Sequence, residues 1–163
     1  MNLATAIAAG TNHSLALRSD GTVVAWGRTK ENQCAVPPGL SNVLSIAAGG
    51  NQSMALLNSG TVTNWGGTFG TIPAGLTNAT AIAAGTNFCL ALRSNGTVVA
   101  WGDNGLGQTN VPVSASNVVA IAAGASHGLA LRTDGHVISW GSVTNVPVDL
   151  TNVMAAGWAS AWR

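Results

Sequence analysis

Charged side chains are scarce in this sequence. Only 7% of its 163 residues are Asp, Glu, Lys or Arg, and the formal net charge is +1. The six basic residues are scattered along the chain, whereas a nucleic-acid-binding surface needs clustered Lys and Arg that release counterions. We therefore expect no nucleic-acid partner, and the solvation of the surface must come from Asn, Thr, Ser and Gly.

Cysteine is rare, tyrosine is absent, and no long apolar run occurs. Cys34 and Cys89 are the two cysteines and lack CxxC spacing, so neither a disulfide framework nor a metal site is expected. No apolar segment is long enough to cross a bilayer. The repeats start close to Met1, so the sequence shows no signal peptide. The lack of tyrosine removes one of the side chains that anchor tight interfaces.

What the sequence does contain is an internal repeat. The stretch AIAAGTNHSLALRSDGTVVAWG, residues 6–27, recurs without insertion at 45–66, 81–102 and 120–141, and residues 153–163 begin a fifth unit. One tryptophan closes each complete unit: Trp26, Trp65, Trp101 and Trp140. Regular self-similarity of this kind indicates one repeat domain over residues 1–163, in which neighbouring units bury each other's faces.

Within each unit the pattern predicts three short antiparallel strands. Asp20 and Gly21 lie between two apolar runs, a signal for a hairpin with a type I′ turn. Both faces of such a sheet are apolar and need cover, which radial stacking in a β-propeller provides. A Val-Pro or Ile-Pro step in each linker predicts a minimal outer strand or none. We therefore predict an all-β propeller of three- to four-stranded blades, with about four blades and a partial fifth.

The unit AAG-x-x-H-S-L-A-L-x-x-D-G-x-V-x-x-W-G, with DNGLGQTNVP at 103–112, resembles the regulator-of-chromosome-condensation repeat superfamily. The short period and the Val-Pro linker are most similar to its compact bacterial branch, which includes a secreted propeller that inhibits β-lactamase. The resemblance slightly favours a secreted protein, although the compartment stays open.

Known members of that superfamily are seven-bladed rings, and this chain has four complete units. The chain is therefore a piece of a longer or engineered protein, a ring with fewer blades, or a subunit that assembles. The simplest assembly is a homodimer whose open ends meet, with residues 153–163 pairing against the neighbour.

The resemblance to this inhibitor implies that target binding uses a ring of aromatic side chains, which follow each AAG directly. The matching positions here are small and polar, and only one residue there is aromatic. The candidate binding residues are Thr11, Asn12, Asn51, Asn87, Ser126 and Trp158. Inhibition of β-lactamase is disfavoured for this reason.

Several residues invite a catalytic interpretation that the repeat explains more simply. His13 and His127 share a column with Gln52 and Phe88, so we expect these histidines to bond to blade backbone. Asp20 and its counterpart Asp134 are expected to serve the hairpin turn, where Asp tolerates a left-handed conformation. The tryptophan column is expected to pack between blades, which leaves Trp158 and Trp162 as candidates for exposed contacts.

The sequence thus predicts a noncatalytic propeller module, without cofactor or metal, that binds another protein or itself. Two alternatives remain open: a secreted enzyme inhibitor of the β-lactamase type, and a carbohydrate-binding propeller with one pocket per repeat.

Overall fold

The computed structural model describes residues 2–67, 70–150 and 152–154, and it is built from β-strands. Within these residues the strands form four three-stranded antiparallel sheets, each with its strands in sequence order. The strands are β1 (Ala4–Ala9), β2 (His13–Arg18), β3 (Val23–Gly27), β4 (Val43–Gly49), β5 (Gln52–Leu57), β6 (Val62–Gly66), β7 (Ala79–Ala84), β8 (Phe88–Arg93), β9 (Val98–Gly102), β10 (Val118–Ala123), β11 (His127–Arg132) and β12 (Val137–Gly141). No helix in this part of the chain is long and apolar enough to cross a membrane.

Each sheet is one blade, and the four blades correspond to the four complete repeats. In the described residues the linkers add no further strand, so each blade has three strands, as the prolines in the linkers predicted. The fifth unit, 153–163, lies almost wholly outside the described residues. The all-β propeller architecture is confirmed.

The hairpin between the second and third strands differs from the predicted type I′ turn. Gly21 has a φ of 77°, but Asp20 is not among the residues with positive φ. The amide of Gly21 donates to the Arg18 carbonyl (2.9 Å), and the amide of Arg18 donates to the Thr22 carbonyl (2.8 Å). This is a three-residue loop that closes on a left-handed glycine, so the prediction of a type I′ turn was wrong.

The acidic or amide residue of this loop also has a different role from the predicted one. Asp20 Oδ1 accepts the Thr22 amide (3.0 Å) and the Thr22 hydroxyl (2.6 Å). Asn95 Oδ1 accepts both groups of Thr97 in the same way. The residue is therefore needed for its side-chain oxygen and not for tolerance of a left-handed backbone.

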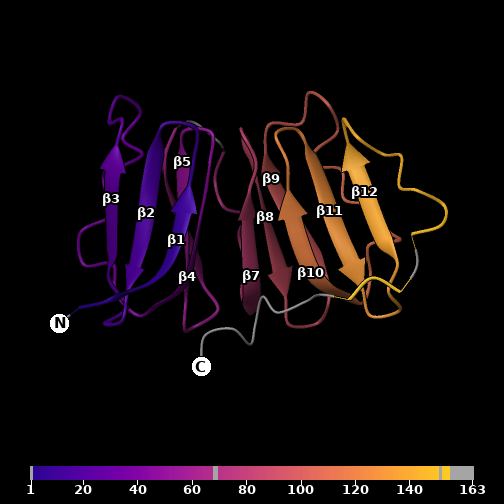
Figure 1. Ribbon diagram of the computed structural model, residues 1–163, viewed down its shortest axis with the longest axis horizontal. Helices are drawn as coiled ribbons and strands as arrows, with labels where there is room; N and C mark the ends of the chain where they lie inside the picture. The colour runs from indigo at the N-terminus through magenta and orange to yellow at the C-terminus, as the bar shows by residue number, and fades with distance from the viewer. Residues whose placement is uncertain (1, 68–69, 151, 155–163) are drawn as a thin grey trace.

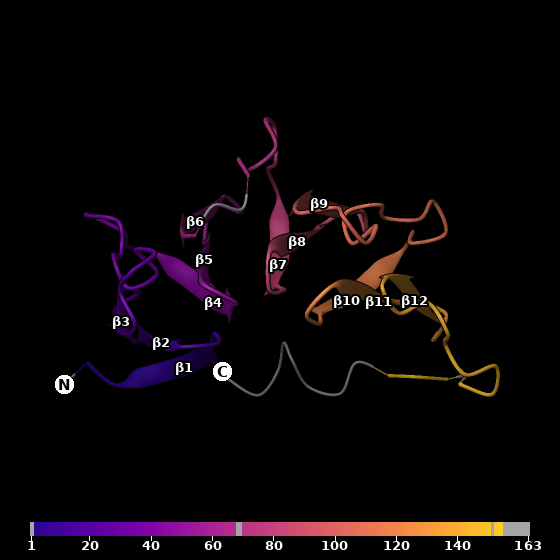
Figure 2. The same cartoon turned by 90° about the horizontal axis from the view of Figure 1, so that it is seen from above.

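The blades stand side by side in an open arc, with blade 1 (β1–β3) and blade 4 (β10–β12) at its ends (Figures 1 and 2). Each blade has two apolar faces that follow from the period-two alternation of its strands. The face toward the next blade, here called the leucine face, contains Leu15 and Leu17 in blade 1 and Met54 and Leu56 in blade 2. The face toward the preceding blade, here called the tryptophan face, carries the isoleucine of the first strand and the tryptophan of the third strand of each repeat, as Ile46 and Trp65 do in blade 2.

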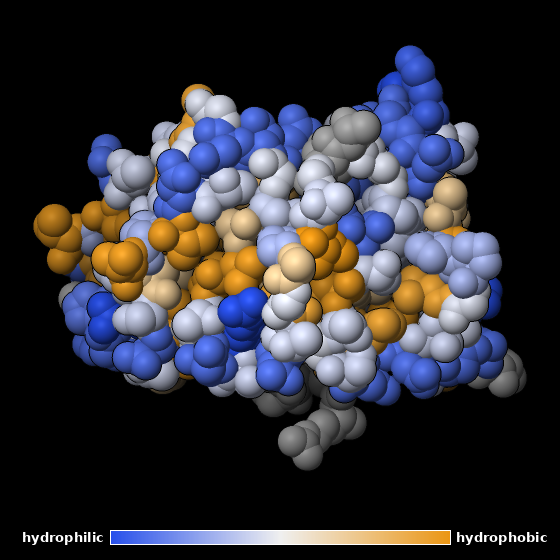
Figure 3. All heavy atoms as spheres, turned by 180° about the vertical axis from the view of Figure 1, so that it is seen from behind, coloured by the Kyte–Doolittle hydropathy of each residue, from blue (hydrophilic) through white to orange (hydrophobic). Residues whose placement is uncertain are grey.

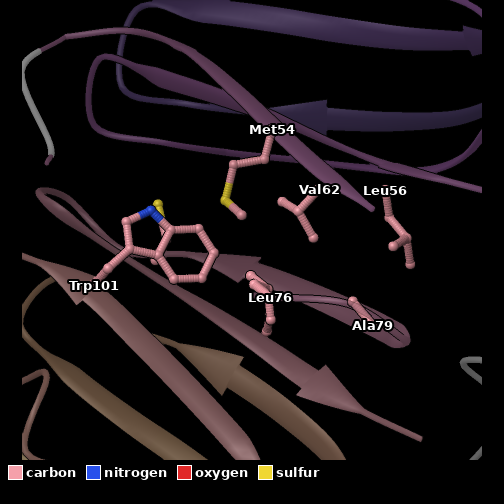
Figure 4. Packing of buried hydrophobic residues seen from close by; sticks show 8 residues of the cluster. Met54, Leu56, Val62, Leu76, Ala79 and Trp101 are labelled. Carbon is pink, nitrogen blue, oxygen red and sulfur yellow. The ribbon is translucent and has the colours of Figure 1, made fainter. Parts of the chain in front are cut away.

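Three apolar clusters fill the spaces between successive blades. Figure 4 shows the one between blades 2 and 3, in which Met54, Leu56 and Val62 lie opposite Trp101, with Leu76 and Ala79 beside them. Hydrophilic residues gather at the upper and lower edges of the molecule and apolar ones in a band between them (Figure 3). The core of this protein is thus a series of interfaces between neighbouring sheets.

The tryptophan column confirms this packing in three blades and departs from it in one. Trp101 and Trp140 are 5% and 3% exposed, and Trp65 is half-buried, but Trp26 is 51% exposed. The indoles of Trp65 and Trp140 donate to the backbone carbonyls of Gln33 (3.0 Å) and Gln108 (2.9 Å), which belong to the preceding linkers. Trp26 differs because blade 1 has no described blade or linker before it.

Candidate binding face

The turns that follow each AAG lie along one edge of the arc, at the top of Figure 1, where the linkers also leave the blades. In three blades the turn is closed by an amide of the AAG glycine that donates to the carbonyl of the first residue of the next strand. These bonds join Gly10 to His13 (2.9 Å), Gly85 to Phe88 (2.8 Å) and Gly124 to His127 (2.9 Å). The repeat therefore places equivalent short turns next to one another, and we call their surface the loop face.

Backbone hydrogen bonds join neighbouring turns across the blades. The Thr11 amide donates to the Gly50 carbonyl (3.0 Å), and the Thr86 amide donates to the Ala125 carbonyl (3.1 Å). Blade 2 has glycine where the other blades have Thr11, Thr86 and Ala125. A Cβ atom at Gly50 would lie 2.0 Å from the Thr86 carbonyl oxygen, so this close approach requires glycine. The loop face is a continuous surface and not four independent loops.

Five of the six candidate residues lie on this face. Four of them occupy the equivalent second position after AAG, and Thr11 occupies the first position in blade 1. Thr11, Asn12 and Asn87 are exposed, while Asn51 and Ser126 are half-buried. The sixth, Trp158, lies outside the described residues.

The backbone of four of these residues also has a structural role. The carbonyls of Asn12, Asn51, Asn87 and Ser126 accept an amide from the start of the following linker, at 2.8 to 3.0 Å. Their backbone is therefore committed to the fold, which leaves the side chains available for contacts.

The histidine column lies beneath the loop face. His13 is 3% exposed, and its Nε2 is 2.9 Å from the Ser53 hydroxyl of the next blade, which itself donates to the Gln33 carbonyl (2.8 Å). His13 thus reaches the Gln33 backbone through the Ser53 hydroxyl. It also has a hydrogen bond with the backbone of Gln52 in blade 2, as the sequence predicted. Burial lowers the pKa of His13, although a hydrogen bond with Gln52 opposes this effect.

Gln52 takes the same place in blade 2 and does reach the backbone. Its Nε2 donates to the carbonyls of Gly85 (3.1 Å) and Phe88 (2.8 Å) in blade 3. The Cys89 thiol lies 3.0 Å from Gln52 Oε1, and burial raises its pKa to about 12. A thiol with so high a pKa stays protonated at neutral pH, so Cys89 is a packing residue and a poor nucleophile.

Sequence reasoning missed two buried glutamines in the linkers. Gln33 and Gln108 are almost fully buried, and each closes its own linker loop. Gln33 Oε1 accepts the Glu31 amide (3.0 Å), and Gln108 Oε1 accepts the Leu106 amide (2.8 Å). The sequence did contain a signal for this role, because both glutamines stand three residues before a linker valine that precedes proline. The signal is hard to see because the rest of the linker sequence varies.

The described residues contain no group of three or more His, Cys, Asp or Glu side chains that could hold a metal ion. The polar groups that the loop face presents are hydroxyls and amides. Such a surface can form hydrogen bonds with a partner, and its side chains supply no strongly charged anchor.

Comparisons with known structures show the same fold. The chain is similar to Prp20p from Saccharomyces cerevisiae, a protein studied for its binding to Gsp1p and histones, with 22% identity and a TM-score of 0.73 over 86% of this chain and 45% of that one. It is also similar to the ectodomain of the receptor kinase ACR4 from Arabidopsis thaliana, with 21% identity and a TM-score of 0.75 over 93% of this chain and 55% of that one. The chain thus spans about half the length of these proteins.

A third similar structure is the computationally designed protein Ika4. It is 22% identical, has a TM-score of 0.55, and is covered over 92% of its own length by 86% of this chain. Comparison with curated protein sequences gives no match.

The sequence model of the regulator of chromosome condensation (RCC1) repeat matches residues 4–33, 79–108 and 118–145, which together are more than half of the chain. These segments contain blade 1, blade 3 and blade 4 with their turns and the start of their linkers. The chain therefore belongs to the regulator of chromosome condensation (RCC1) repeat family.

Proposed function

We propose that this protein is a noncatalytic interaction module that binds another protein through its loop face. The observation that carries the proposal is the row of closely packed turns, bonded between blades 1 and 2 and between blades 3 and 4, which holds Thr11, Asn12 and Asn87 exposed along one edge of the arc. A surface fixed by backbone bonds loses little conformational entropy when a partner binds.

One similar structure supports this proposal. Prp20p has been studied for its binding to Gsp1p and histones, and its structure with Kap60 bound is known. The fold is therefore used for protein contacts in a relative, although fold alone does not carry function from one protein to another.

The loop face also bears on the two alternatives. A β-lactamase-type inhibitor would use aromatic anchors after each AAG, and the described turns carry none. A carbohydrate-binding propeller would need one pocket per repeat, whereas the described turns pack closely on one another, with backbone bonds between those of blades 1 and 2 and those of blades 3 and 4. Protein binding is the function that this geometry supports best.

The test is an affinity purification with the immobilised full chain, followed by an affinity measurement with the purified captured protein. Asn12→Arg and Asn87→Arg change exposed side chains on the loop face, and Ser41→Arg changes an exposed residue of a linker outside it. We expect the first two variants to weaken binding at least tenfold and Ser41→Arg to leave it unchanged. A partner that is insensitive to both asparagine variants, or binding seen only on a glycan array, would contradict the proposal.

A further inference from the structure

The two ends of the arc carry apolar surfaces whose equivalents are covered everywhere else in the chain. On the tryptophan face of blade 1, Ile7 is 80% exposed and Trp26 is 51% exposed. The isoleucines in the same column, Ile46, Ile82 and Ile121, each pack against one of the inter-blade clusters. Among the residues that the structure describes, blade 1 therefore has an ordinary tryptophan face without the neighbouring blade that such a face meets in the other three blades.

The leucine face of blade 4 lacks its neighbour in the same way. Leu129 is half-buried, whereas Leu15, Met54 and Leu90 in its column are 0% exposed. Ala122 is exposed, whereas its counterparts Ala8, Ala47 and Ala83 pack against the clusters. One end of the arc thus exposes a tryptophan face and the other end a leucine face. Inside the chain, faces of these two types cover each other.

The three internal interfaces show what covers each of these surfaces. At every one of them a leucine face meets a tryptophan face. Backbone hydrogen bonds also join the loop-face turns of blades 1 and 2 and those of blades 3 and 4. At the edge away from the loop face, amides of the first strand of one blade donate to the hairpin glycine of the blade before, as Val43 does to Gly21 (3.1 Å). A second copy of this chain presents these same two faces.

We infer that two copies of this chain associate head to tail, with the leucine face of blade 4 in one copy packed on the tryptophan face of blade 1 in the other. A head-to-tail contact forms a closed ring or an open filament, depending on the angle between subunits. Blades 1 and 4 both turn these faces to the open side of the arc (Figures 1 and 2). Two arcs that face each other can therefore make both contacts at once and close a ring of eight blades.

One local exchange accompanies this association. Asn152 has a φ of 57°, close to the 56° of Asn42 and Asn78, and the Val153 amide donates to the Gly135 carbonyl at 3.3 Å. The chain thus follows blade 4 along the path by which it enters blades 2 and 3. In the dimer, Ala4 of the second copy aligns with this place and replaces Val153 beside Gly135.

The test is sedimentation velocity of the full chain over a range of concentrations. We expect the wild type to sediment at twice the 16.2 kDa chain mass and at no larger species. Ile7→Arg and Ala122→Arg place a charge on opposite ends of the arc, and each should shift the protein to the mass of one chain. Both residues are exposed in the single chain, and circular dichroism confirms that the variants fold.

A matched control is Val113→Arg, because Val113 is fully exposed in the linker between blades 3 and 4. This variant should remain a dimer. A wild type that stays at 16.2 kDa would overturn the inference. So would a dimer that survives both charged variants, or a species that grows with concentration beyond two copies.

The surfaces at the two ends are separate from the loop face, so the two tests are independent. Asn12→Arg and Asn87→Arg should leave the dimer mass unchanged while they weaken partner binding. If Ile7→Arg becomes a monomer that still binds the captured protein, the result supports the head-to-tail assembly alone. If an asparagine variant stays a dimer but no longer binds the captured protein, the result supports the loop face alone.

Discussion

At the scale of single residues, the glycines of the AAG turns are required by what lies above them. A Cβ atom at Gly10 would lie 2.2 Å from the His13 ring, and one at Gly85 would lie 2.0 Å from the Phe88 ring. The bulky residue that starts the second strand folds back over the glycine in both blades. The glycine column and the ring column of the repeat are therefore one packing unit.

Gly50 allows a sharper test, because its neighbour is backbone. We expect Gly50→Ala to destabilise the fold by more than about 2 kcal/mol, since the new methyl group would meet the Thr86 carbonyl and the residue keeps a φ of 50°. Gly39→Ala is the matched control, with a φ of 78° and no atom within 4 Å of the added carbon. It should cost about 1 kcal/mol from backbone strain alone. Equal losses in urea unfolding would show that the blade 2 turn does not approach blade 3 this closely.

His13 predicts a pH dependence of stability. Burial lowers its pKa below the ordinary value of 6.5, so at mildly acidic pH the unfolded chain binds a proton that the folded chain does not. Stability is therefore predicted to fall as pH drops through 6.5 and to level off below the folded-state pKa. The variant His13→Gln introduces the residue type that blade 2 has at Gln52, and it removes the titrating side chain. Between about pH 7 and pH 5 the free energy of unfolding should fall more steeply in the wild type than in the variant, and parallel curves would contradict the assignment.

At the scale of the element, the hairpins show how side-chain chemistry supports a repeated turn. The Ser59 hydroxyl is hydrogen-bonded to the Thr61 hydroxyl and accepts the Thr61 amide at 3.4 Å, whereas Asn95 Oδ1 accepts the Thr97 amide at 3.1 Å and its hydroxyl at 2.7 Å. We expect Ser59→Asn to stabilise the protein by about 0.5 kcal/mol, because the longer side chain can accept the Thr61 amide at the shorter distance seen at Asn95. Asn95→Ser is the reciprocal change and should destabilise it by a similar amount in thermal unfolding. Changes of the same sign would refute this explanation of the loop.

The tryptophan column gives a second comparison between elements. Trp140 is 3% exposed and donates to the Gln108 carbonyl, so Trp140→Ala should cost about 3–5 kcal/mol. Trp26→Ala should cost much less in the single chain, where this residue is 51% exposed. Both variants are best measured in the Ile7→Arg background, which keeps the chains apart. A large loss at Trp26 in that background would mean that it is covered within one chain.

Much of each element could be predicted from the sequence, because the same sequence pattern occurs in all four repeats. The strands, the three-stranded blades and the packing of Trp65, Trp101 and Trp140 follow from alternation and periodicity. The turn type was misjudged, because Asp-Gly signals a hairpin but does not fix the loop length. The bond of His13 to Ser53 could not be foreseen, because it crosses blades and depends on how closely neighbouring sheets approach. The linker glutamines were missed for another reason, since they bond within linkers whose sequences vary.

At the scale of the whole molecule, the sequence indicated that an open array leaves two apolar ends, and the structure identifies them. Ile7, Trp26 and Ala122 are exposed members of their columns that lack a neighbouring blade within the described part of the chain. Exposed apolar patches of this kind are interaction surfaces or aggregation sites. The contacts proposed between chains are of the same type as those between blades inside the chain. The same kind of apolar packing therefore determines both the stability of the fold and the assembly.

A crystal structure of the full chain tests the central claim, that every blade face is covered by the complementary face of a neighbouring blade. The predicted result is two copies that close a ring, with Trp26 of one copy packed against Leu129 of the other. Separate arcs with Trp26 in solvent, or copies joined through any other surface, would contradict it.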